Sequence, residues 1–322
     1  MMISSEREYG DFCQAHTAEL PIFFQPWWLD AVGQHGHWQK YVIRGSNDNT
    51  IGIWPIFTKR RYGFQWRTLP PYSPVSGPWF AENDALSQPL LAALTSQLAG
   101  GQLYWLVHSM RYVQQALWWQ KNGFEVHIWH TYRLPVTNDP DNLFRRFRTT
   151  TRNEIRKAAR NLLVRPVGHL QHFLPLYIRH ARAKGIFTPA VAQVFECIYN
   201  ASLERGQGQL LCAYDKEGNL HAGVFLVWDH QNTYVQSISR NQDFQTSSAT
   251  RLILWQAIKQ SATSGRAFDF NGGDVPSIGD FFASFGAEKV AYLRAVLYPN
   301  ALVRFVVRLA KYVRHPQSRL FH

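Results

Sequence analysis

Residues 268–292 have the sequence FDFNGGDVPSIGDFFASFGAEKVAY, and this stretch indicates how the chain folds. Aromatic and apolar residues at 266–270 predict a short strand, 278–285 predict a helix, and 289–298 predict a second strand. Gly286 stands where this helix ends just before a strand, a position that glycine often occupies. The stretch therefore predicts a strand, a helix and a strand in immediate succession.

A similar arrangement lies earlier in the chain. A helix predicted over 110–120 is followed by Gly123 and a strand over 124–134, and Gly123-Phe-Glu aligns with Gly286-Ala-Glu. A glycine at a helix end explains each of these positions singly, but it does not explain a whole repeated order of elements. We therefore expect an internal duplication.

The order of predicted elements supports this duplication. The second half predicts a strand, two helices, three strands, a helix, a strand, a helix and a strand. The hairpin expected over 39–57 aligns with the hairpin expected over 209–229. We predict an α/β fold with domains at 1–137 and 162–298, joined by a basic helical linker at 138–161 and followed by a basic amphipathic tail at 299–322.

Composition narrows the class of protein. Of 322 residues, 46% are hydrophobic and 17% are charged, which excludes a disordered chain. The net charge of +12 suggests a polyanion, a phosphate-rich cofactor or an anionic membrane as a partner.

Three widely spaced cysteines indicate neither a disulfide framework nor a zinc ribbon. The opening residues do not resemble a signal peptide, so we expect a cytoplasmic protein.

Several longer segments resemble those of a known family. RNEIRKAARN, RHARAKGIFTP, YDKEGNLHAGVFLVWD and the stretch quoted first are together similar to the tandem GNAT group. FFQPWWLDAV and PPYSPVSGPWF resemble segments of the first domain in that group. The group contains Fem-type peptidoglycan-bridge aminoacyl transferases and their BioF2-like acyltransferase relatives. The resemblance implies two tandem GNAT-like domains that transfer an acyl group directly to an amine.

The resemblance also implies a place for the donor. In a GNAT protein the donor phosphates lie at the N-terminus of the helix that follows the third hairpin strand, where free N–H groups favour an anion. Here that region offers Ser247, Ser248, Ala249 and Arg251, and acyl-CoA is the expected co-substrate. The usual glycine-rich phosphate loop is absent, because no glycine lies between Arg240 and Gly265. The same pattern is consistent with a capped helix that binds nothing.

The segment FDFNGGD carries the candidate catalytic groups. Ligands commonly bind beyond the carboxyl ends of strands, so Asp269 and Asp274 are candidates to bind or deprotonate an acceptor amine, with Asn271 beside them. The alternatives are a structural carboxylate at Asp269 and a helix cap at Asp274. Along the preceding strand, the predicted acceptor-binding residue is Tyr234 and the predicted donor-binding residues are Ser237 and Arg240, although an ordinary polar strand face has the same pattern. No metal ligand spacing is present.

Two basic segments are candidates for binding anions. Arg145, Arg148, Arg152 and Arg156 share one face if the linker is a continuous helix, and such a stripe suits the phosphates of tRNA, coenzyme A or a lipid pyrophosphate. A solvated helix face is the alternative. The long coiled-coil arm of some Fem transferases is not visible in residues 170–193.

The tail over 300–315 predicts a basic amphipathic helix. Its apolar side chains (Leu302, Phe305, Val306, Leu309, Val313) fall on one face, and its basic ones (Arg304, Arg308, Lys311, His315) on another. It suits peripheral contact with the inner face of the cytoplasmic membrane. Alternatively, it docks on the domain core with its cations outward.

Three functions fit these features. The first is acyl transfer from acyl-CoA to a small-molecule or lipid-linked amine in cell-envelope metabolism. The second is Fem-like aminoacyl transfer from charged tRNA to a peptidoglycan precursor. The third is a non-catalytic protein that binds membranes or polyanions, which the missing phosphate-loop glycines favour.

Overall fold

The computed structural model describes residues 2–61, 64–81, 88–98, 103–109, 113–298 and 300–314. The chain forms two compact units: unit 1 contains Met1–His16, Gly33–Ile128 and Tyr292–His322, and unit 2 contains Thr17–Val32 and Trp129–Ala291. These limits differ from the domain boundaries predicted above, because residues 17–32 pack with the second unit and the C-terminal residues with the first. The boundaries of the internal repeat remain a prediction.

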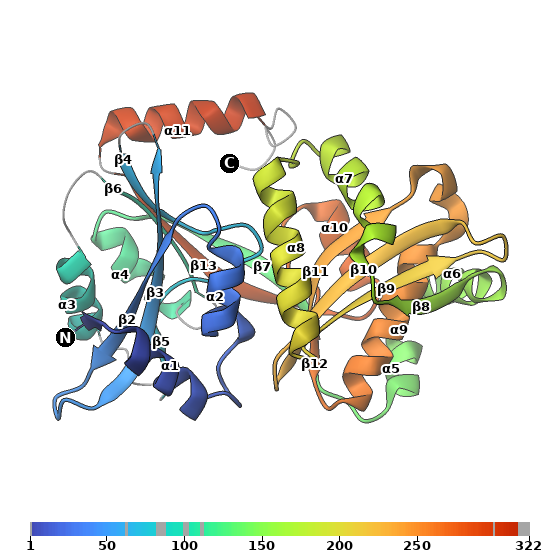
Figure 1. Cartoon of the computed structure of the whole chain (residues 1–322), viewed down its shortest axis with the longest axis horizontal. Coiled ribbons are helices and arrows are strands. Elements are labelled where there is room, and N and C mark those ends of the chain that lie inside the picture. The colour runs from blue at the N-terminus through green and yellow to red at the C-terminus, as the bar shows by residue number, and fades with distance from the viewer. Residues whose placement is uncertain are drawn as a thin grey trace. The chain divides into compact units, whose positions relative to one another are not determined.

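Unit 1 is built on the antiparallel hairpin of β2 and β3, and further strands pair with this hairpin on both sides (Figure 1). Its strands follow the order β1-β2-β3-β4-β6-β13, with β5 beside β3. The predicted hairpin is confirmed, because β2 pairs with β3 and places Ile43 opposite Gly52. Its elements are β1 (Met2–Ser4), α1 (Glu6–Ala15), β2 (His37–Arg44), β3 (Thr50–Arg61), β4 (Phe64–Thr68), β5 (Trp79–Phe80), α3 (Gln88–Leu98), β6 (Leu103–Ser109), η3 (Val113–Gln115), α4 (Ala116–Lys121) and α11 (Ala301–Arg314).

Unit 2 has the predicted succession of elements around strands in the order β7-β12-β11-β10-β9-β8. Helices α6 and α9 cover one face of its sheet, and α7 and α8 cover the other (Figure 1). Its elements are η1 (Ile22–Phe24), α2 (Pro26–Val32), α5 (Pro140–Arg146), α6 (Thr149–Asn161), β8 (Leu163–Val167), η4 (Leu170–His172), α7 (Leu174–Ala183), α8 (Pro189–Glu204), β9 (Gly208–Tyr214), β10 (Leu220–Trp228), β11 (Asn232–Arg240), η5 (Gln242–Ser247), α9 (Ala249–Thr263), β12 (Ala267–Asp269) and α10 (Pro276–Ala283).

The last strand of each predicted repeat pairs in the sheet of the other half. Strand β7 (Glu125–Leu134) comes from the first half, yet its residues Arg133 and Leu134 pair with Asp269 and Phe268 of β12 in unit 2. Strand β13 (Glu288–Leu297) comes from the second half and pairs with β6 in unit 1. This exchange brings β7 to the candidate site of unit 2.

Alternation along the strands separates the two faces of the sheet in unit 2. Val224 and Leu226 of β10 join a buried cluster with α6 and α9. Phe225 points to the opposite face, where it contacts Phe195 and Tyr199 of α8. Both faces of β10 are therefore buried, as expected for a central strand covered by helices.

The predicted linker at 138–161 is part of unit 2, and it is not one continuous helix. It breaks between α5 and α6, where Phe147 and Arg148 have extended backbone angles. Phe147 is buried against Trp255 and Phe285, and the Arg148 N–H donates to the carbonyl of Ser284 at 2.9 Å. These contacts require an extended backbone there, so the prediction of a single arginine-lined helix was wrong.

Other elements differ in smaller ways. The helix expected over 169–184 is η4 followed by α7, and the sequence did not predict β1, α1, β5 or η5. The predicted helices over 84–99 and 110–120, and the predicted tail, extend partly outside the described residues, at 84–87, 99, 110–112 and 315–322. Within the described ranges, no helix is long and apolar enough to cross a membrane.

Candidate functional site

Two neighbouring parallel strands of unit 2 part after a short paired stretch. Strand β11 pairs with β12 from Asn232 opposite Ala267 to Tyr234 opposite Asp269. Strand β12 then ends, while β11 continues to Arg240, paired on its other side with β10. Ligands often bind beyond the carboxyl ends of such strands. The parting thus leaves one edge of residues 235–240 without β12 beside it.

Strand β11 also carries a bulge just past the last β12 pair. Ser237 lies opposite Phe225 and Val235 lies opposite Leu226, so Gln236 is an extra residue in β11. A bulge changes the direction of side chains and is common next to active sites. As a result, Tyr234 and Ser237 point to the same face of the sheet, although three positions separate them.

Unpartnered polar atoms lie around the parting strands. The side-chain nitrogen of Gln236, the hydroxyl of Ser239 on β11 and Nε of Arg251 on α9 are buried and have no hydrogen-bond partner among the described residues. Buried polar groups are normally paired, so such atoms call for an explanation such as a ligand or water. The sequence analysis missed Gln236, because the bulge is set by strand register and leaves no motif.

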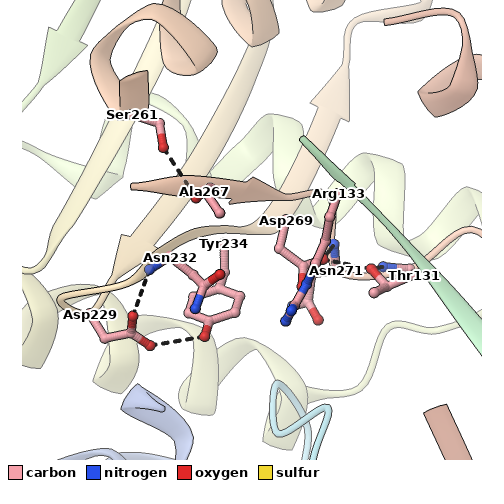
Figure 2. A network of polar contacts seen from close by, with 10 residues as sticks. Thr131, Arg133, Asp229, Asn232, Tyr234, Ser261, Ala267, Asp269 and Asn271 are labelled. Carbon is pink, nitrogen blue, oxygen red and sulfur yellow. Dashed lines mark hydrogen bonds and ion pairs between the residues drawn. The ribbon is translucent and has the colours of Figure 1, made fainter. Parts of the chain in front are cut away.

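Asp269 is the centre of a buried polar network that Figure 2 shows. Its Oδ1 accepts from the Thr131 hydroxyl at 2.6 Å and from the Asn271 N–H at 2.7 Å. Its Oδ2 accepts from Nε of Arg133 at 2.6 Å. Burial lowers the pKa of Arg133, but the charge and hydrogen bond of Asp269, together with Tyr234 and Asp229, raise that pKa overall. Both carboxylate oxygens are thus engaged, which suits a carboxylate that positions its neighbours.

A second buried carboxylate, Asp229, holds Tyr234 (Figure 2). The Tyr234 hydroxyl donates to Oδ2 of Asp229 at 2.9 Å, and the Ile22 N–H donates to the same oxygen at 3.1 Å. The ring of Tyr234 packs edge-on against Phe23, with the ring centroids 4.8 Å apart. Burial and the nearby Asp229 charge raise the Tyr234 pKa well above its usual range. Tyr234 is therefore a neutral hydrogen-bond donor.

Asp274 is more accessible than Asp269 and lies in the loop after β12. Its Oδ1 accepts from the His130 N–H at 2.8 Å and lies 3.6 Å from Nδ1 of the His130 ring. Partial burial raises the Asp274 pKa above its ordinary value, although His130 opposes this effect. The side chain is 34% exposed, so this carboxylate combines solvent access with increased basicity.

The loop between Asp269 and Asp274 has unusual backbone geometry. Asn271 has φ of 55°, and its N–H is tied to Asp269. Gly273 has φ of +131°, and a Cβ there would lie 2.4 Å from the Tyr132 ring. Gly273 is therefore required by both conformation and space.

The N-terminus of α9 places the predicted donor-binding residues together, but a carboxylate already lies beside them. Ser248 has φ of 56° and its hydroxyl donates to Glu154 of α6, while the Ser247 hydroxyl accepts from the Ala249 N–H at 3.4 Å. The Arg251 guanidinium stacks 5.0 Å from the centroid of the Phe281 ring. The negative charge of Glu154 at the N-terminus of α9 stabilises the fold, but the same charge repels a phosphate that would bind there.

The remaining predicted anion-binding residues are distributed over two places. Arg145 lies in the last turn of α5. Arg152 donates to the Arg145 carbonyl, and Arg156 lies 5.5 Å from the Phe144 ring centroid, so these side chains do not form one continuous stripe. Arg240, at the exposed end of β11, lies near His180 and Lys184. Burial lowers the pKa of His180 to about 4, and both cations add to this effect.

Comparison with known proteins identifies the class. Residues 145–277 match the family described as acetyltransferase (GNAT) domain. Unit 2 therefore contains a GNAT domain, the acyltransferase fold that the sequence predicted. No curated protein matches the chain significantly.

Solved structures extend the likeness to the whole chain. FemX superposes with a TM-score of 0.68 at 13% identity, over 91% of this chain and 96% of that one. The C-terminal domain of a putative lysylphosphatidylglycerol synthetase from Agrobacterium fabrum gives a TM-score of 0.57 at 12% identity, over 96% and 98%. A tandem GNAT protein from the clavulanic acid biosynthesis pathway gives 0.53 at 10%, over 93% and 98%. The chain therefore shares the fold of FemX and of a tandem GNAT protein.

Within the described residues, no group of three or more His, Cys, Asp or Glu side chains has the arrangement of a metal site. Cys13 and Cys212 are buried, and burial raises the pKa of each thiol to about 12. Neither thiol is suited to act as a nucleophile at neutral pH.

Proposed function

We propose that this protein is an acyltransferase that moves an acyl group from acyl-CoA to an amine by direct attack. The observation that carries the proposal is the parting of β11 and β12 beyond Tyr234 and Asp269, in a unit that matches the GNAT domain. The edge of β11 that continues beyond its last pair with β12, together with the buried Gln236 amide, is suited to hold the donor carbonyl.

In the proposed reaction, the amine lone pair attacks the thioester carbonyl carbon, and the carbon–sulfur bond breaks to release coenzyme A as a thiolate, which then takes up a proton from water. Asp274 accepts the proton of the amine, since its carboxylate is accessible and more basic than usual. The Gln236 amide donates to the oxygen that becomes negative. Asp269 acts as a positioning residue, because its oxygens already hold Thr131, Arg133 and the Asn271 N–H.

The donor phosphates would lie at the N-terminus of α9, near Ser247, Ala249 and Arg251. Ser237, Arg240 and the exposed arginines of α5 and α6 add positive or polar groups for the rest of the donor. The acceptor would be a small or lipid-linked amine of cell-envelope metabolism, bound near Tyr234 and Asn271 by a cytoplasmic protein. The fold shared with FemX and with the putative lysylphosphatidylglycerol synthetase domain supports an envelope role.

Calorimetric titration with acyl-CoA of several chain lengths tests donor binding. We expect saturable binding of at least one acyl-CoA, and no heat or thermal shift with any of them would refute the acyl-CoA proposal. A turnover assay with a panel of amines then measures activity.

Gln236→Leu sharpens this test. Because the Gln236 amide nitrogen is buried and has no partner in the described part of the chain, its removal should leave the protein as stable as before or more stable. If the amide stabilises the developing oxyanion, kcat should nevertheless fall by about 100-fold or more. Unchanged kcat in a folded Gln236→Leu variant would remove this role.

Aminoacyl transfer from charged tRNA to a peptidoglycan precursor is the second candidate. It is favoured by the fold shared with FemX and by the exposed Arg145, Arg148 and Arg156. It predicts tRNA binding that weakens steeply as salt rises. Filter binding at increasing salt decides between the donors, because weak binding with a flat salt dependence contradicts the tRNA candidate.

A further inference from the structure

The C-terminal helix α11 presents apolar side chains to solvent. Leu302, Phe305 and Leu309 are 70%, 64% and 50% exposed. Their spacing of three and four residues places them on one face of the helix. A helix that docks on a protein core buries such a face, so the apolar side of α11 is left for another partner.

The opposite side of α11 is the one that contacts unit 1. Arg304, just over half a turn from Leu302, forms an ion pair of 3.2 Å with Glu125 of β7. Val303 and Val307 are half-buried. At the start of the helix, Asn300 Oδ1 accepts from the Val303 N–H at 2.8 Å. Arg304 thus contacts unit 1, unlike in the docked helix considered above, in which the cations would face outward.

The charge of the surrounding sequence indicates what this face contacts. Between Asn300 and His322 the sequence has no Asp or Glu, and its cations are Arg304, Arg308, Lys311, Arg314 and Arg319. Helices with an apolar stripe and many Lys or Arg residues lie in the plane of a membrane surface and are attracted to anionic lipids. The helix is also too short and too charged to span a bilayer.

We propose that α11 binds the surface of an anionic lipid bilayer, with Leu302, Phe305 and Leu309 inserted at the boundary between headgroups and acyl chains. A second copy of the chain would also cover the apolar face. That arrangement, however, brings two acid-free cationic segments together, which is electrostatically unfavourable. Charge complementarity therefore favours the bilayer. This proposal goes beyond the proposed acyl transfer and does not depend on it.

Flotation of the full-length protein with vesicles tests the proposal. One set of vesicles contains phosphatidylcholine with phosphatidylglycerol, and the other contains phosphatidylcholine alone. We expect the protein to float with the anionic vesicles at low salt, and less at high salt. The triple variant Leu302→Ser, Phe305→Ser and Leu309→Ser should lower the partition coefficient by at least about tenfold. The matched control is Leu117→Ser on α4, where Leu117 is 69% exposed, and it should float like the parent protein.

Circular dichroism and thermal melting test whether the variants are folded. We expect that they are, because the replaced side chains are exposed. Absence of flotation with anionic vesicles at low salt overturns the proposal. So does equal flotation of the triple variant and the parent protein. If sedimentation shows self-association that the triple variant abolishes, without lipid binding, the apolar face is an interface between copies. If only tRNA binding depends on α11, the partner is a nucleic acid.

Discussion

The carboxylate of Asp269 accepts a hydrogen bond of 2.6 Å from Nε of Arg133, which lies 136 residues earlier in the chain. The two residues also pair across β12 and β7. The Asp269 side chain is 3% exposed and that of Arg133 is 28% exposed. This ion pair therefore joins the end of β12 to a strand that comes from the first half of the sequence.

Asp269→Asn should destabilise the protein by about 2–3 kcal/mol, because it leaves the Arg133 guanidinium partly buried without its counter-charge. Urea unfolding measures this free energy. In the double variant Asp269→Asn with Arg133→Gln, we expect part of the loss to be restored, since neither charge remains. A double variant that loses the sum of both single effects would contradict a specific pair.

Asp274→Asn should reduce kcat by about 100-fold or more with little effect on stability, because the proposed proton acceptor is lost. In the parent enzyme, burial raises the Asp274 pKa, so the rate should fall as pH drops through a value above the ordinary pKa of aspartate. A pH–rate profile measures this limb. The exposed Asp280→Asn on α10 is the control, and equal rates for both variants would exclude Asp274 from the role.

Gly273→Ala should cost about 2–4 kcal/mol of stability, since its Cβ would lie 2.4 Å from the Tyr132 ring in a backbone conformation that alanine disfavours. Gly272→Ala is the matched control: its φ is +153°, but no atom of the described residues lies within 4 Å of the added Cβ. Thermal unfolding of both variants compares the costs. Equal destabilisation would show that backbone conformation alone, and not the Tyr132 ring, makes Gly273 necessary.

Acidification should destabilise the protein through His180. Its pKa is lowered to about 4 in the folded state, whereas an unfolded histidine titrates near 6.5. The folded state therefore binds fewer protons than the unfolded state. The contribution of neutral His180 to the free energy of unfolding is thus complete above about pH 6.5 and is lost as pH falls toward 4. We expect a loss of about 2 kcal/mol, measured by urea unfolding at pH 7 and pH 4. The His180→Gln variant should lose less, and an identical pH dependence would contradict this assignment.

Glu154→Gln should strengthen the binding of acyl-CoA by about three- to tenfold, because it removes a negative charge beside the N-terminus of α9. The gain should shrink at high salt. Calorimetry on the parent protein and on the exposed Glu196→Gln control provides the comparison. If Glu154→Gln leaves the affinity unchanged, the donor phosphates do not bind at this helix end.

Local patterns were enough to predict most of the fold. The alternation of 209–229 predicted the hairpin of β9 and β10, and Gly286 correctly marked the end of α10 before β13. These features depend on neighbours in the sequence, since strand alternation, turns and helix ends involve residues only a few positions apart. The helix break at Phe147 had no such local signal, because it depends on contacts with Trp255 and Phe285.

The sequence by itself determined the α/β class, the order of elements and the segment FDFNGGD as the place of interest. Only the tertiary structure decided which groups surround Asp269, because Thr131 and Arg133 reach it on a strand exchanged between the halves. It also decided that Gln236 occupies a bulge and that the apolar face of α11 points outward. Strand partners, register and the burial of a helix face depend on long-range packing, which no short stretch of sequence contains.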